Sequence, residues 1–232
     1  MKRIPILPSR PRHVFLTDRH PRDNIGVNFH RPALFEGHEF AAFRGGDDPA
    51  AVSALAHETA AMMLAHVQDA PAHVIDKVVK LTDEHGLDVV AELWSTTGPH
   101  SLPGSLWQLY LLRAVIHERA DEIAHLYERG NEALHTADHV IAGAPTPVGP
   151  AEMRDLVDQI LRGAFTGDFG HALERSGSFC RVVAAGSIAE ANASDLVAAE
   201  RAKQLTTQAS RLMTMAGQFV ECSRLWRVGK LS

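Results

Sequence analysis

Two sets of histidines have a spacing that could serve metal binding or proton transfer. The first set is His135 and His139, which lie four residues apart with Glu132 on the same side of a predicted helix. Two histidines at this spacing can bind one metal ion. They also form the polar face opposite an apolar one, and a chain with 14 histidines is expected to contain such pairs by chance. We therefore predict a solvated helix face here, and no bound metal.

The second set is His117, Asp121 and His125, which follow one another at four-residue steps. They continue a polar stripe that starts at Arg113, beside the apolar stripe of the same predicted helix. The ordinary interpretation is charge-assisted pairing among Arg113, His117 and Asp121. A metal or proton-transfer role is the alternative, because histidine changes its charge near neutral pH and this helix is expected to be buried.

Aromatic side chains and a Gly/Pro-containing loop meet near the middle of the chain. Trp94, His100, Trp107 and Tyr110 lie in or beside the loop of residues 98–104. Packing in the core is the simpler explanation for the large aromatic residues. Aromatic groups beside a loop could instead line a small-molecule pocket. These four residues are our pocket candidates.

No motif in the sequence identifies an enzyme. A P-loop, a dinucleotide-binding fingerprint and a nucleophile elbow are all missing from the sequence. Asp168-Phe169-Gly170 spells a kinase motif, but the other kinase segments are missing, and Asp168 is better interpreted as a helix cap. The two cysteines, Cys180 and Cys222, are far apart and are predicted to be buried free thiols. We expect no cofactor.

The elements that must position all these residues are helices. Alanine, the best helix former, is abundant, and runs of β-branched residues are short. We predict helix starts at Asp48–Pro49, Pro103, Pro150 and Asp168, and helix ends at Gly86, Gly130, Gly143 and Gly186, with Asn131 capping a new helix. The most apolar helix, Pro103–Arg129, is placed at the centre. The fold class is therefore all-α, a multi-helix bundle of about eight or nine helices.

Residues 1–48 differ from the rest in composition and are predicted to form an extended, basic, proline-containing arm. Residues 1–35 contain five prolines, seven Lys or Arg residues and two acids, which gives a charge of +5. The whole chain has a charge of −5, so the remainder carries −10. An acidic body repels phosphate backbones, which makes nucleic acid an unlikely partner except through the arm alone. We expect a homodimer, or a protein partner, contacted through the arm.

The helical domain is predicted to span residues 49–232, with a possible subdivision at the proline-rich stretch 143–150. The start of the chain is broken by prolines and arginines and does not have the form of a signal peptide. No stretch has the length of apolar sequence that a membrane span needs. We therefore expect no membrane association, and we expect a cytoplasmic location that also suits free cysteines.

Four segments carry a resemblance to a known family. They are Glu92–Trp94, Ser101–Arg113, Gly149–Leu156 and Phe179–Val183. Over residues 50–228 the chain resembles an actinobacterial family of small helical proteins of unassigned function, some of which are named after the RNA polymerase β subunit. The resemblance implies a helical fold and a bacterial lineage, and it brings no catalytic residues with it.

These patterns together favour a non-enzymatic protein-interaction or regulatory module. The basic arm, the acidic body and the missing nucleophile and metal motifs support this hypothesis. The alternative is a histidine-based, possibly metal-dependent enzyme, or a small-molecule-binding protein. The two hypotheses differ in whether the two histidine sets converge in space. Spacing within one helix does not show how two helices meet.

Overall fold

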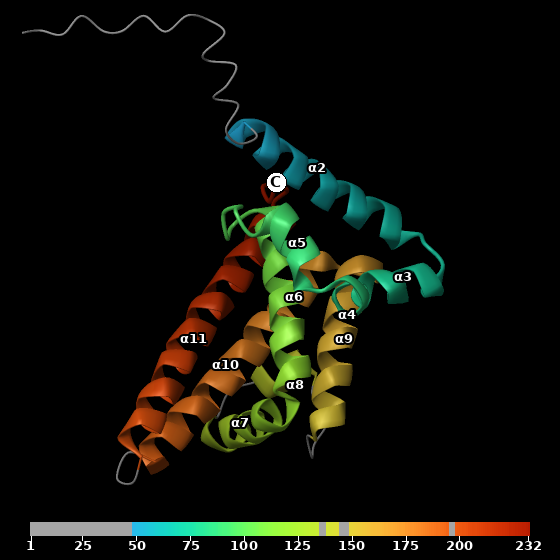
Figure 1. The fold of residues 1–232 in the computed structure, drawn as a ribbon. Coiled ribbons are helices and arrows are strands. Elements are labelled where there is room, and N and C mark those ends of the chain that lie inside the picture. Colours follow the sequence, from blue (N-terminus) through green and yellow to red (C-terminus); the bar gives the residue numbers. More distant parts are fainter. Residues whose placement is uncertain (1–47, 135–137, 144–148, 195–197) are drawn as a thin grey trace, which may run out of the picture. The chain divides into compact units, whose positions relative to one another are not determined.

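The computed structural model describes residues 48–134, 138–143, 149–194 and 198–232. Over these residues the chain forms ten α-helices, labelled α2 to α11, and no strand, which confirms the all-α prediction (Figure 1). They belong to one compact unit that spans residues 46–232. The predicted arm, apart from Asp48, lies outside the described residues. No helix in the described ranges is long and apolar enough to cross a membrane.

The first four helices follow local signals in the sequence. Helix α2 (Pro49–Gln68) starts where predicted, and the Asp48 carboxylate accepts a hydrogen bond from the N–H of Ala50 at 3.0 Å. It is followed by α3 (Ala72–Val79), α4 (Leu81–His85) and α5 (Leu87–Trp94). Gly86 ends α4 with a φ of 77°, in the left-handed region that favours glycine. The predicted end at Gly86 is therefore confirmed.

The long helix predicted over Pro103–Arg129 is wrong in one respect, because the chain breaks it into two. Helix α6 (Leu102–Glu118) ends at Arg119, where φ is −121° and ψ is 37°, and α7 (Ala120–Ala133) starts directly after it. Neither glycine nor proline marks the break. The apolar spacing also continues across the break, from Ile116 to Ile123. The sequence pattern therefore gives no sign of the change in helix direction, which we attribute to tertiary packing.

The second half of the chain contains the two longest helices. Helices α8 (Asp138–Ala142), α9 (Pro150–Thr166), α10 (Phe169–Ser194) and α11 (Ala199–Arg227) follow in order. The Asp168 carboxylate caps α10, as predicted, by accepting a hydrogen bond from the N–H of Gly170 at 2.8 Å. Helices α10 and α11 run side by side along most of their length (Figure 1).

Two predicted helix ends, Gly130 and Gly186, prove to lie inside helices. Helix α7 continues through Gly130 and Asn131, and α10 continues through Gly186. A Cβ atom added at Gly186 would overlap the carbonyl oxygen of Leu126, and one added at Gly130 would overlap that of Val182. The two glycines therefore let the backbones of α7 and α10 touch, and they are required by packing rather than by a helix end.

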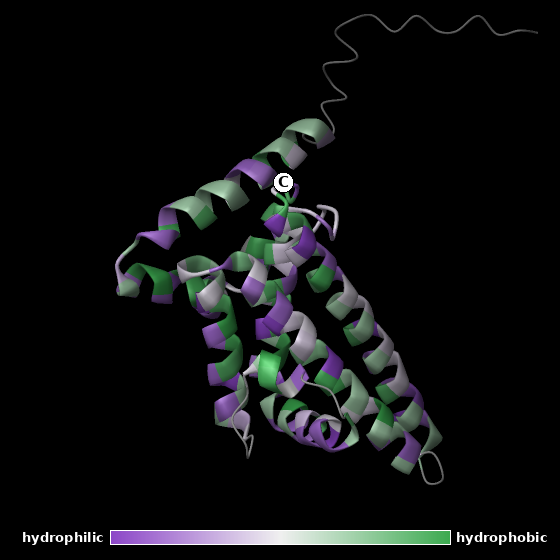
Figure 2. Cartoon of the chain, turned by 180° about the vertical axis from the view of Figure 1, so that it is seen from behind, coloured by the Kyte–Doolittle hydropathy of each residue, from purple (hydrophilic) through white to green (hydrophobic). Residues whose placement is uncertain are grey.

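The core is shared between two central helices. Helix α6 is buried on most sides, as predicted, and packs against α2, α5, α7, α9 and α11. Helix α10 is equally enclosed, by α7, α8, α9 and α11. Some of the surrounding helices, such as α3 and α9, are amphipathic. Seen from behind, α9 carries polar residues on one side and apolar residues on the side that faces the bundle (Figure 2).

Candidate ligand-binding groove

A groove of about 500 Å³ lies beside α11. Helix α11 packs along α10 but contacts α6 much less. The groove is lined by residues of α6 and α11, with α7 and α10 contributing to its walls. Its apolar surface comes from the part-buried side chains of Val115, Leu212 and Met215. Beneath them lie buried core residues of α6 and α10, which include Ile116 and Phe179. The volume is within the range of small-molecule sites, roughly 300–1,000 Å³.

The rim of this groove is cationic. Among the described residues, one carboxylate, that of Glu200, lines it, against four cations: Arg119, Arg201, Lys203 and Arg211. Helix α11 supplies three of these four cations. The fourth stands at the break between α6 and α7, so that break places a positive charge at the groove. This local excess of positive charge contrasts with the net charge of −5 of the whole chain.

The carboxylate of Glu122 on α7 links two cations, Arg119 and Arg201, at one end of the groove. Glu122 accepts a hydrogen bond from Nε of Arg119 at 2.9 Å and another from Arg201 at 2.9 Å. Burial pushes the pKa of Glu122 up, but the hydrogen bonds from Arg201 and Arg119 outweigh it and hold that pKa below its ordinary value. Within the described residues, neither Lys203 nor Arg211 forms an ion pair. Two of the rim cations therefore keep their charge available.

The four pocket candidates from the sequence occupy different surroundings. Trp94 and Tyr110 are buried in the core, with ring centroids 6.3 Å apart, and the Trp94 indole N–H donates to the hydroxyl of Thr59 at 3.2 Å. Trp107 is half-buried and His100 is exposed. None of the four lines the groove described above. The structure thus brings two of them together, as core packing.

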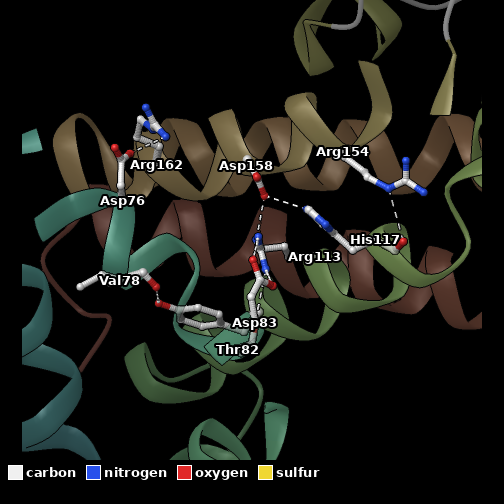
Figure 3. A network of polar contacts seen from close by, with 10 residues as sticks. Asp76, Val78, Thr82, Asp83, Arg113, His117, Arg154, Asp158 and Arg162 are labelled. Atoms are coloured by element: carbon white, nitrogen blue, oxygen red, sulfur yellow. Dashed lines mark hydrogen bonds and ion pairs between the residues drawn. The ribbon is translucent and has the colours of Figure 1, made fainter. Parts of the chain in front are cut away.

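Arg113 is the most deeply buried charge among the described residues, with 1% of its side chain exposed. Its guanidinium donates two hydrogen bonds to the Asp83 carboxylate, at 2.6 and 2.8 Å (Figure 3). Its Nε donates to Asp158 on α9 at 2.7 Å. Burial alone would lower the pKa of Arg113, but the hydrogen bonds to Asp83 and Asp158 outweigh it and raise that pKa. The buried cation therefore stays charged and joins α4 and α9 to α6.

The histidines of the described residues do not converge. His117 is paired with Asp158, with Nε2 2.9 Å from the carboxylate oxygen, rather than with Asp121, which is exposed (Figure 3). His125 is mostly exposed and lies 3.5 Å from the carboxylate of Glu190. His135, and the side chain of His139, lie outside the described residues. Within the described ranges no group of three or more His, Cys, Asp or Glu side chains could hold a metal ion.

The acid sensitivity of the fold should depend on Arg113. Its hydrogen bond holds the pKa of Asp83 below the ordinary value. A carboxyl group with a depressed pKa stabilises the fold above its unfolded-state pKa, about 3.9, and this stability is lost as the pH falls through the folded pKa. We expect the free energy of unfolding to fall below about pH 4, and to fall less steeply in Asp83→Asn. Urea titrations at a series of pH values measure this, and identical slopes in the two proteins would contradict it.

Both cysteines are buried free thiols, as predicted. Burial raises the pKa of Cys180 to about 12 and that of Cys222 to about 11. The Cys222 thiol also donates to the carbonyl oxygen of Pro99 at 3.3 Å. Because the thiolate is the reactive form, neither group is activated as a nucleophile at neutral pH.

Comparisons with known proteins give no indication of function, so the functional argument rests on the groove. No protein-family model matches the chain, and neither curated proteins nor solved structures show a significant similarity to it. The resemblance of residues 50–228 to an actinobacterial family therefore stays a prediction. The sequence patterns missed the groove because its residues come from four helices. Arg119 and Arg201 meet at Glu122 although they are 82 positions apart.

Proposed function

We propose that this chain is a non-enzymatic regulatory protein that binds a small molecule in the groove between α6 and α11. The observation that carries the proposal is the apolar surface of Val115, Leu212 and Met215 inside an opening of about 500 Å³. Removing such surface from water is favourable by roughly 25 cal/mol per Å². A ligand with an apolar body gains this free energy without a large rearrangement of the bundle.

The walls of the groove are held in place before any ligand arrives. Ile116 and Phe179, beneath the groove, are fully buried core residues. Glu122 fixes the turn between α6 and α7 to the start of α11 through Arg119 and Arg201. A site that is already formed loses little free energy to ordering when its ligand binds. This supports binding of a small molecule. The partner role of the basic arm rests on its sequence alone and stays a prediction.

The test is the binding of Nile red, a neutral apolar dye, to the full-length protein. We expect Met215→Gln to weaken dye binding about tenfold, because part of the buried apolar contact, about 1.4 kcal/mol, is lost. Met213→Gln is the matched control, since Met213 is on the same helix, 49% exposed, and outside the groove. Fluorescence titration gives both dissociation constants. Equal dye binding by the two variants, or none by the unaltered protein, would refute the groove as the site.

A further inference from the structure

The groove has a cluster of cations at one end, the polar end, and at its other end apolar side chains line it beside the rim cation Arg211. Arg119, Arg201 and Lys203 lie at the end formed by the α6–α7 break and the first turns of α11. Leu212 and Met215 lie further along α11. Twelve residues separate Lys203 from Met215, which corresponds to about 18 Å of helix at 1.5 Å per residue. A straight apolar chain with one polar end matches this arrangement.

Among the residues that the structure describes, the polar end has one positive charge in excess. Three cations, Arg119, Arg201 and Lys203, face two carboxylates, those of Glu122 and Glu200. The two arginine side chains are still 41% and 46% exposed although Glu122 binds both. Each guanidinium has five N–H donors, so both retain donors for a ligand. One additional negative charge would balance this end of the groove.

We propose that the ligand is a single-chain carboxylate, with its carboxylate at Lys203 and the two arginines and its alkyl chain along Leu212 and Met215. This inference rests on the proposed binding function and specifies the chemistry of the ligand. A carboxylate supplies the one negative charge that the polar end lacks, and arginine binds carboxylates through paired N–H donors. The alkyl chain covers the apolar surface of the groove.

The experiment compares three twelve-carbon probes that differ only in the head group. Dodecanoate, dodecanol and dodecyltrimethylammonium are titrated below their aggregation concentrations into the full-length protein, and Nile red displacement is followed. We expect dodecanoate to bind at least tenfold more tightly than dodecanol, and the ammonium probe to bind most weakly. High salt should reduce the preference for dodecanoate, because these charges are only partly buried.

Two variants assign the preference to the polar end. Lys203→Gln should weaken dodecanoate binding about fivefold and leave dodecanol binding unchanged. Lys230→Gln, at an exposed lysine outside the groove, is the matched control and should change neither. A dodecanoate affinity that Lys203→Gln does not alter would overturn the assignment of the carboxylate to this end.

The remaining outcomes separate this inference from the proposed function. Equal affinities for dodecanoate and dodecanol would overturn the carboxylate and leave small-molecule binding intact. Failure of all three probes and of Nile red to bind would refute both. Sedimentation of the ligand-free protein tests the other occupant of the groove. A dimer that Leu212→Glu dissociates would show that a second copy fills the groove, and would overturn the inference.

Discussion

Replacing Gly186 by alanine is expected to lower the free energy of unfolding by about 3 kcal/mol, the upper part of the range for overpacked sites. The added methyl group would overlap the carbonyl oxygen of Leu126 and lie 2.9 Å from the backbone nitrogen of Gly130. Both neighbours are backbone atoms of α7, so no side-chain rotation relieves the overlap. The two helices must move apart, and the contacts along both are weakened.

Gly217→Ala is the matched control for this prediction. Gly217 is also inside a long helix, α11, but a Cβ added there meets nothing within 4 Å. Alanine is favoured over glycine in a helix, so this variant should be more stable by up to about 1 kcal/mol. Chemical denaturation followed by circular dichroism measures both changes. A stabilised Gly186→Ala would contradict the close contact between α7 and α10.

Replacing Arg113 by methionine is expected to lower the free energy of unfolding by about 3 kcal/mol, the lower end of the range for breaking a buried ion pair. The change removes the arginine from the carboxylates of Asp83 and Asp158, and Asp158 keeps only its contact with His117. The lower end applies because the Asp83 side chain is 45% exposed and water can solvate it. Adding Asp158→Asn to this variant should restore part of the loss, since one of the two stranded charges is then removed.

A surface arginine provides the comparison. Arg227 pairs with Glu174 at 2.7 Å, but its side chain is 53% exposed. Exposed pairs of this kind contribute at most about 1 kcal/mol, so Arg227→Met should change stability little. Thermal unfolding of the three variants beside the unaltered protein measures the differences. Equal losses for Arg113→Met and Arg227→Met would refute the structural role of the buried network.

The helix ends that the sequence predicted correctly are those fixed by local chemistry. Asp48 and Asp168 cap their helices through hydrogen bonds to N–H groups two residues ahead, and Gly86 adopts a positive φ. Each signal acts within a few residues, so it can be read without knowledge of the fold. The boundaries that were missed, at Arg119 and around Gly130, depend on contacts with helices far along the chain.

The functional features were harder to predict for the same reason. The sequence placed Arg113 and His117 on one helix face but assigned them the wrong partner, Asp121. Their actual shared partner, Asp158, is on α9, more than 40 positions away. Spacing shows which residues share a face, and it does not show which helix lies opposite. The cations of the groove were hidden in the same way, because the acidic net charge gave no sign of a local positive surface.

The backbone contact between α7 and α10 also sets an order of events during synthesis. Gly130 cannot meet its partner until Gly186 has been added, 56 residues later. At the usual 5–20 residues per second, roughly 3–11 s pass between the two. During that interval the surface of α7 at Gly130, where the backbone of α10 packs in the folded protein, is not covered by α10. The contact between α7 and α10 therefore forms late in synthesis. A pulse-labelled nascent chain halted before residue 186 should stay sensitive to protease within α7.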